Sequence, residues 1–139
     1  MYLNEAINLA DTMVRQRNRV MPWTWGQALF GYALNELDVY LGEDRYFFFT
    51  KSFCDYYVVH PPRVNSSDTS APALITYGMY KRTGDIRYKH LTDLVLNYIR
   101  NEPRIINDAV NHLGNSLAGK PGNTYRESSA TVLLSLIHI

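Results

Sequence analysis

The 139-residue sequence has a single cysteine, Cys54, so it cannot form an internal disulfide and implies no oxidising compartment. It also has no excess of one charge. Its 14 basic and 13 acidic side chains give a formal net charge of +1, which excludes a strongly basic nucleic-acid binder and an acidic tail protein. No apolar run approaches the roughly 20 residues of a membrane span, and no signal-peptide-like stretch opens the chain. We therefore expect a cytoplasmic protein with no membrane or nucleic-acid partner. A periplasmic location stays open if a signal peptide precedes this sequence.

Patterns for metal and phosphate binding are missing as well. The four histidines and Cys54 lack the spacing of metal ligands, and the sequence has neither a glycine-rich phosphate loop nor a Gly-x-Ser-x-Gly elbow. We therefore expect no metal and no cofactor. Cys54 lies between aromatic residues and is interpreted as a small core residue.

Apolar residues at helical spacing are the main positive signal. Positions i, i+3 and i+4 are apolar over five stretches, which predicts amphipathic helices. The expected helices cover the N-terminus to about residue 17 and residues 23–41, 44–59, 70–82 and 86–101. The third is aromatic on most faces, so we expect it to be buried. The pattern decays into loop after Arg104.

Glycines and short polar residues mark the expected helix ends. Gly42 and Gly84 stand where a helix favours a left-handed residue after its last turn. The expected N-caps are Asp85 for the last helix and Asp68, Thr69 or Ser70 for the fourth.

An internal repeat groups these helices into similar units. Residues 41–46, Leu-Gly-Glu-Asp-Arg-Tyr, are echoed 42 residues later by residues 83–88, Thr-Gly-Asp-Ile-Arg-Tyr. A period of about 40 residues with two helices per unit is typical of stacked helical hairpins. The predicted fold class is therefore all-α, built from hairpins of a solenoid or a closed toroid. Because such folds need about three or more units, we expect an incomplete one.

Two tryptophans at the start of the second expected helix are candidate ligand contacts. Trp23 and Trp25 lie two residues apart where a turn enters a helix, so they cannot both face one core. At least one is therefore expected to line a cleft, where a flat ring can stack on a sugar. The alternative is that both pack between hairpins.

Asp68 and His112 are the candidate polar site residues. The repeat counterpart of Asp68 is Gly26, beside Trp25, so Asp68 and Trp25 are expected at equivalent ends of two helices that face the same side. Asp68 is either a site carboxylate or only a helix cap. The imidazole of His112 could bind a carboxylate substrate or tune a nearby acid, or it could be an ordinary loop histidine.

Several short motifs follow one another between Trp23 and His112. They are Trp23-x-Trp25-Gly26-Gln27-Ala28-Leu29-Phe30-Gly31-Tyr32, the two Gly-acidic-x-Arg-Tyr turns, Asp68-x-x-Ala71-Pro72-Ala73-Leu74, and Pro103-Arg104 before His112. In order and spacing they resemble the unsaturated uronyl hydrolases, that is, the unsaturated rhamnogalacturonyl and glucuronyl hydrolases of glycoside hydrolase families 105 and 88. The resemblance implies an (α/α)6 toroid longer than this chain, which would then be an N-terminal fragment.

The resemblance also implies a substrate and a reaction. The substrate is an oligosaccharide from a pectin or glycosaminoglycan-type polymer that ends in a 4,5-unsaturated uronic acid. An aspartate protonates the C4=C5 enol ether, water adds at C5, and the resulting hemiketal falls apart to release the sugar. This needs general acid–base carboxyl groups and no cofactor, unlike the nucleophile and acid of ordinary glycosidases. The family pattern matches Asp68 to one of two catalytic aspartates, His112 to the histidine that precedes the second, and Trp25 to an aromatic residue at the cleft wall. We therefore expect Asp68 to be catalytic and Trp25 and His112 to bind substrate, with Trp23 beside Trp25 as a further candidate.

The sequence departs from the family pattern near its end. The second aspartate, the usual proton donor, should follow Tyr-x-x-Ser/Gln-Trp-x-Asp. Residues 125–128 begin that pattern, but no tryptophan or aspartate follows. We interpret residues 1–128 as the N-terminal portion of an (α/α)6 domain and 129–139 as a non-native read-through tail, and we expect this chain to be inactive by itself. A helical-repeat protein-binding module and another (α/α)6 sugar enzyme, such as an epimerase, stay open as alternatives.

Overall fold

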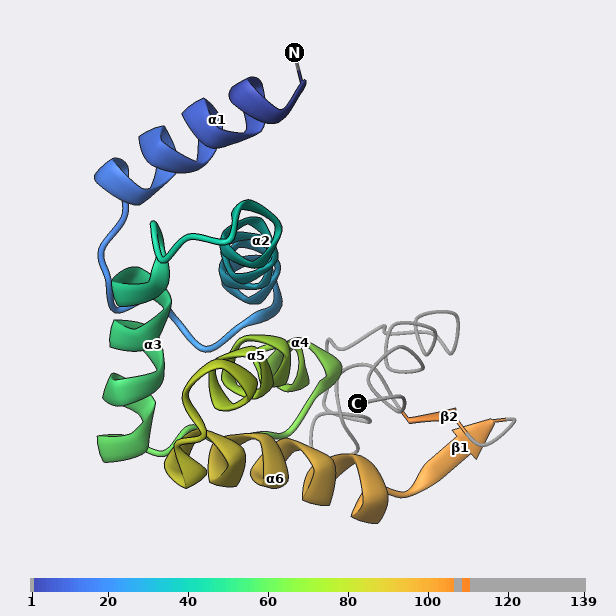
Figure 1. The fold of residues 1–139 in the computed structure, drawn as a ribbon. Helices are drawn as coiled ribbons and strands as arrows, with labels where there is room; N and C mark the ends of the chain where they lie inside the picture. Colours follow the sequence, from blue (N-terminus) through green and yellow to red (C-terminus); the bar gives the residue numbers. More distant parts are fainter. Residues whose placement is uncertain (1, 107–108, 111–139) are drawn as a thin grey trace.

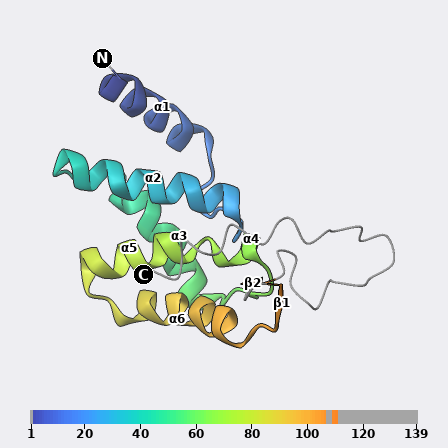
Figure 2. The ribbon, with the colours of Figure 1, turned by 90° about the vertical axis from the view of Figure 1, so that its right-hand side faces the viewer.

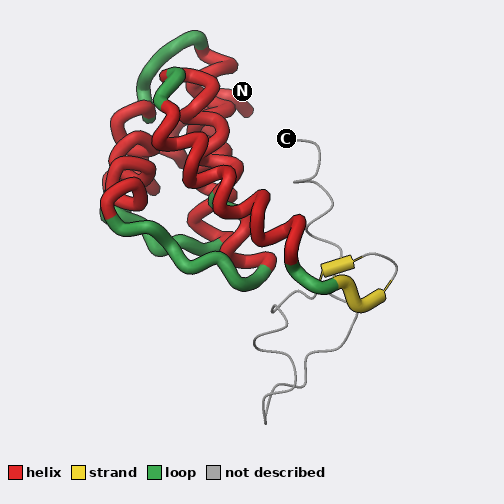
Figure 3. The backbone as a smooth tube through the Cα atoms, turned by 90° about the horizontal axis from the view of Figure 1, so that it is seen from below, coloured by secondary structure: helices red, strands yellow, loops and turns green. Residues whose placement is uncertain are grey.

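The computed structural model describes residues 2–106 and 109–110, and this part of the chain is all-α, as predicted (Figure 1). Its helices are α1 (Tyr2–Gln16), α2 (Trp25–Leu41), α3 (Phe47–Val59), α4 (Ser67–Ser70), α5 (Ala73–Thr83) and α6 (Ile86–Asn101). Two short strands, β1 (Arg104–Ile106) and β2 (Ala109–Val110), pair antiparallel at the edge of the helical part (Figure 3). The sequence analysis expected loop in this region and missed the two strands.

Helices α2 and α3 form one hairpin, and α5 and α6 form the next. In Figure 2, α2 and α5 lie side by side and run in the same direction, so both hairpin turns are at one end of the molecule. Helices α1, α3 and α6 lie outside this parallel pair (Figure 1). Gly42 and Gly84 close α2 and α5 in the left-handed conformation, with φ of 66° and 71°, as the repeat predicted.

The fourth expected helix is divided into two. Its first turn is α4, whose N-cap is Ser66, and the longer α5 begins after Pro72. The expected caps Asp68, Thr69 and Ser70 therefore lie inside α4, and the prediction for this cap is wrong. Ser66 takes the role because it forms a reciprocal capping box with Thr69.

Helix α3 is less buried than its aromatic sequence suggests. Phe53 and Cys54 are fully buried, but Phe48 is 72% exposed and Val59 is 71% exposed. The prediction of an entirely buried helix is therefore wrong for the described structure. The core lies instead where α2, α3, α5 and α6 meet. Its completely buried large side chains are Phe53, Ile75, Met79, Tyr88 and Val95.

The repeat extends to side-chain contacts between successive outer helices. The Tyr46 hydroxyl, at the start of α3, donates to Asp11 of α1 at 3.0 Å and lies 3.3 Å from the Ile7 carbonyl oxygen. The Tyr88 hydroxyl, at the equivalent start of α6, donates to Asp55 of α3 at 2.6 Å. Tyrosine–aspartate hydrogen bonds thus join α3 to α1 and α6 to α3.

The protonation of these pairs suits the hydrogen bonds. Burial, helped by the bond to Asp11, raises the pKa of Tyr46 to about 12. Burial likewise raises the pKa of Tyr88. Burial opposes ionisation of Asp55, but hydrogen bonds from Lys51 and Tyr88 outweigh it and keep the pKa of Asp55 below its ordinary value. Neutral hydroxyls therefore donate to ionised carboxylates at neutral pH.

Tyr46→Phe and Tyr88→Phe should each lower the free energy of unfolding by about 1.5–3 kcal/mol, because each leaves a carboxylate without its hydroxyl donor. Tyr40→Phe is the matched control, since Tyr40 is 75% exposed and should change stability by less than about 0.5 kcal/mol. Urea unfolding of the three variants measures the effects. A Tyr88→Phe variant as stable as Tyr40→Phe would show that the tyrosine–aspartate bond does not hold the hairpins together.

Asp85, at the start of α6, makes a pH-dependent contribution to the stability of the fold. Its carboxylate accepts the Arg87 backbone N–H at 3.0 Å and pairs with the Arg87 guanidinium at 2.6 Å. The guanidinium, together with the backbone N–H, lowers the pKa of Asp85 to about 2 from 3.8. A lowered pKa stabilises the fold when the group is ionised, so this stabilisation is complete above pH 3.8 and is lost as the pH falls towards about 2.

Asp85→Ala should therefore destabilise the protein by about 0.5–2 kcal/mol at pH 7. The difference from wild type should shrink as the pH falls through about 2, where half of the wild-type carboxyl groups are protonated. Thermal unfolding of both proteins between pH 7 and pH 2 measures this. A difference that stays constant over the whole range would contradict the assignment of the charged cap.

Candidate functional site

The two tryptophans have opposite environments, as their spacing required. Trp23 is only 9% exposed, and its ring stacks on Phe53 and meets the edge of Tyr57. Trp25, in the first turn of α2, is 54% exposed. The expectation that Trp23 binds substrate does not fit its burial, because core rings cover it. Trp25 keeps the exposure that a stacking platform requires.

Trp23 nevertheless bears on the site, because it fixes the segment that carries Asp68. Its indole N–H donates to the Thr69 carbonyl oxygen at 2.7 Å. This bond holds the residues just before α2 against α4. Helix α4 also contacts α2 itself. The start of α2 and the short helix α4 therefore lie together, at the end of the molecule away from the hairpin turns (Figure 2).

The segment around Asp68 is held by a compact set of hydrogen bonds. The Thr69 hydroxyl accepts the backbone N–H groups of Asn65 and Ser66, both at 3.0 Å, and the Ser70 hydroxyl donates to the Ser66 carbonyl at 2.8 Å. Ser66 and Ser70 are buried, whereas Asp68 is partly exposed. Ser66, and not Asp68, is therefore the N-cap of α4. The partly exposed Asp68 lies on a hydrogen-bonded segment beside the start of α2.

The surface beside Trp25 continues along α2. Leu29 and Tyr32 are 51% and 39% exposed and lie at i+4 and i+7 from Trp25, so all three share one face of the helix. The sequence analysis included Leu29 and Tyr32 in the helical apolar pattern and did not single them out as site residues. Their spacing from Trp25 was the signal that could have identified this stripe.

The other sequence predictions have separate outcomes. His112 lies outside the described residues, as do the segment 129–139 and the expected position of the second aspartate. Cys54 is fully buried, and desolvation raises the pKa of its thiol, so it is the small core residue that was expected. In the described part of the chain, no group of three or more His, Cys, Asp and Glu side chains is arranged to hold a metal ion. None of the described helices is both long enough and apolar enough to cross a membrane.

Asp68 and Trp25 offer two kinds of ligand contact. A carboxylate accepts hydrogen bonds from hydroxyl groups, and an exposed indole packs against the apolar face of a sugar ring. A scan of family models, a search of curated proteins and a search of solved structures return no match for this chain.

Proposed function

We propose that this chain supplies one wall of the active site of a glycoside hydrolase that hydrates the terminal 4,5-unsaturated uronic acid of lyase-generated oligosaccharides. The observation that carries the proposal is the Trp23–Thr69 hydrogen bond, which ties the partly exposed Asp68 segment to the start of α2 beside Trp25. The order of motifs between Trp23 and His112, which resembles the unsaturated uronyl hydrolases, supplies the substrate class.

In this proposal Asp68 acts as one of the two carboxyl groups at the C4=C5 bond. The reaction adds a proton at C4 and a hydroxide at C5, so it needs one acid and one group that orients or deprotonates water. Asp68 orients or deprotonates the water, and Trp25 stacks on a sugar ring and holds the end of the oligosaccharide in place. The sequence has no aspartate after residue 128, where the family pattern places the proton donor. The 139-residue chain alone should therefore bind an unsaturated disaccharide without hydrolysing it.

Titration of the chain with an unsaturated uronyl disaccharide tests this function. Tryptophan fluorescence should change saturably, while the absorbance of the conjugated double bond should stay constant. Asp68→Asn should weaken binding about tenfold or more, because a hydrogen bond to a charged group contributes about 1.5–3 kcal/mol. Asp44→Asn is the matched control, since Asp44 is an exposed carboxylate at the hairpin-turn end.

Three results would decide against parts of the proposal. No saturable fluorescence change would exclude this substrate class for the chain. Equal affinities of wild type and Asp68→Asn would remove Asp68 from the site. Loss of the double-bond absorbance would show that the chain already contains a proton donor.

A further inference from the structure

An apolar groove runs between α1 and α2. Its volume is about 670 Å³, which is within the range of functional pockets. Glu36 is its one charged lining residue in the described part of the chain, and the lining residues that carry the argument below are Ala33, Glu36, Leu37 and Tyr40 of α2 and Ala10 of α1.

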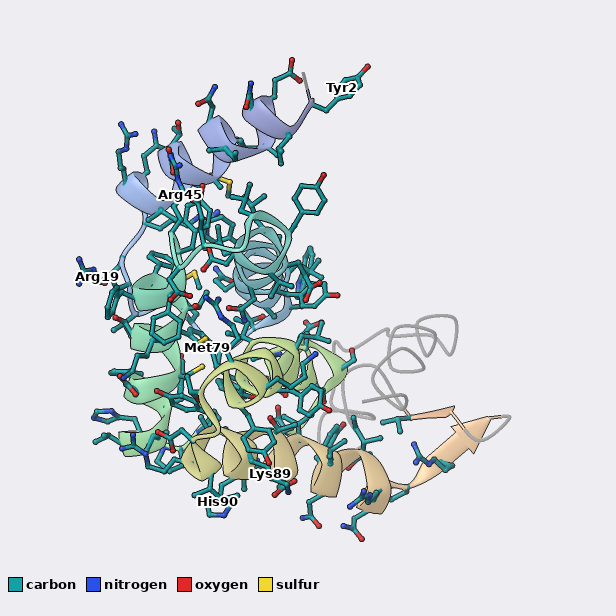
Figure 4. The ribbon with its side chains drawn as sticks, in the orientation of Figure 1. Tyr2, Arg19, Arg45, Met79, Lys89 and His90 are labelled. Carbon is teal, nitrogen blue, oxygen red and sulfur yellow. The ribbon has the colours of Figure 1, made fainter. Side chains whose placement is uncertain are left out.

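The repeat shows what occupies the equivalent position one unit later. Ala33 and Leu37 of the groove correspond, 42 residues on, to Ile75 and Met79 of α5. Both are fully buried. Ile75 packs so closely on α2 that a Cβ atom on Gly31 would overlap with its side chain. Met79 lies among the core helices (Figure 4). The α5 face that matches the groove is therefore covered by α2.

The other two groove positions give the same result. Glu36 corresponds to Gly78, which lies directly against the Asn35 side chain of α2. Tyr40 corresponds to Arg82, which forms an ion pair of 3.0 Å with Asp38 of α2. The α5 positions that correspond to the groove thus lie against α2 or in the core, whereas Ala33, Glu36 and Tyr40 of α2 are exposed on the side of α1.

The outer helices complete the comparison. Helix α1 is joined to α3 by Tyr46 and Asp11, just as α3 is joined to α6 by Tyr88 and Asp55. Helix α1 therefore lies beside α2 as α3 lies beside α5. Helix α2 contacts both α3 and α5, and so fills the gap between them. The groove between α1 and α2 is the same gap one unit earlier, with no described helix in it.

We propose that this groove binds an amphipathic α-helix of a partner, oriented parallel to α2. Two substitutions within the repeat define its chemistry. Where α5 has Gly78, the groove has Glu36, so the bound helix should carry a basic side chain at that position. Where α5 has Arg82, the groove has Tyr40, so the bound helix should carry an apolar side chain instead of an aspartate. Its remaining contacts are apolar, as in helix-in-groove recognition.

A fused helix provides the test, because short free helices are marginally stable in water. The probe has the sequence of residues 24–42 with Asn35→Lys, to face Glu36, and Asp38→Leu, to face Tyr40. It is joined to the N-terminus of the full chain by a flexible linker of about ten Gly and Ser residues. The start of α1 lies near the hairpin-turn end, where a helix parallel to α2 would finish (Figure 2). Fusion raises the effective concentration of the probe to about millimolar.

The fusion should raise the midpoint of thermal unfolding by roughly 5 °C or more. Ala33→Lys should abolish this rise, because Ala33 lines the groove, yet it is exposed and its substitution should leave the unfused chain intact. Val39→Lys, at a 64%-exposed position of α2 outside the groove, should preserve the rise. A fusion without Asn35→Lys and Asp38→Leu should give a smaller rise.

Several outcomes would overturn the proposal. They are an unchanged midpoint in the fusion, or the same rise in the Ala33→Lys and wild-type backgrounds. If the unfused chain is a dimer by light scattering and Ala33→Lys makes it a monomer, the occupant is a second copy. If a hydrophobic dye binds the groove and the fused helix does not displace it, the groove holds a small apolar molecule. The unsaturated disaccharide titration is independent of all these results.

Discussion

Asp38→Ala should lower the free energy of unfolding by about 3–5 kcal/mol, the range expected when one partner of a buried ion pair is removed. The Asp38 side chain is completely buried in α2. Its carboxylate accepts the backbone N–H of Tyr46 at 3.0 and 3.2 Å and pairs with Arg82 of α5 at 3.0 Å. One side chain therefore joins α2 to the start of α3 and to the next hairpin.

Removing Asp38 leaves two donors without their acceptor. The Tyr46 N–H and the largely buried Arg82 guanidinium would both lose a charged partner where little water can replace it. Arg82 would keep Asp44, which it contacts at 2.5 Å, but that carboxylate is on the surface. The loss should therefore be only partly compensated.

Asp44→Ala is the matched control for this prediction. Asp44 contacts the same guanidinium from a position 77% exposed, so its removal should cost no more than about 1 kcal/mol. Urea unfolding of both variants gives the comparison. Similar losses of stability in the two proteins would mean that burial does not make Asp38 the more important partner of Arg82.

The features predicted from sequence are those set by local chemistry. Helical periodicity predicted the bounds of α2 and α6 almost to the residue. Gly42 ends α2 and Gly84 ends α5, because glycine takes a positive φ without strain. The repeat predicted that the second and fourth expected helices start on the same side, and α2 and α5 do run in the same direction. These properties depend on neighbouring residues or on a regular period, so they can be predicted from a single sequence.

The features missed depend on contacts between distant residues. Asp11 and Asp55 are ordinary helix-surface aspartates in the sequence and acquire partners only when Tyr46 and Tyr88 reach them across hairpins. The cap of α4 was misplaced because Pro72 divides the expected helix. Periodicity could show that Trp23 and Trp25 differ in environment, but only the packing against Phe53 decides which one is buried.

The candidate site thus combines Asp68, which was a candidate from the sequence, with supporting hydrogen bonds that the sequence did not predict. Asp68 was found from its place in the sequence, but its orientation depends on Ser66, Thr69 and the indole of Trp23, which are structural residues. Trp23, which was expected to touch substrate, is buried, and its indole N–H donates to the segment that carries Asp68.

The two tryptophans should separate under mutation into one structural and one ligand-binding residue. Trp23→Ala should lower the free energy of unfolding by about 3–5 kcal/mol, because it leaves a cavity beside Phe53 and Tyr57 and removes the hydrogen bond to Thr69. Trp25→Ala should change it by no more than about 0.5 kcal/mol, since the ring is more than half exposed. Urea unfolding measures both effects.

Binding of the unsaturated disaccharide should depend directly on Trp25 and only indirectly on Trp23. Trp25→Ala should weaken binding about tenfold with the fold intact, as expected for loss of an aromatic contact of about 1.4 kcal/mol. Trp23→Phe keeps most of the packing and removes only the bond to Thr69, so it should weaken binding through the loosened Asp68 segment. Amide exchange at residues 66–70 should become faster in Trp23→Phe and stay unchanged in Trp25→Ala. If Trp25→Ala bound the disaccharide as tightly as wild type, the exposed indole would not be part of the site, and the start of α2 would have only a structural role.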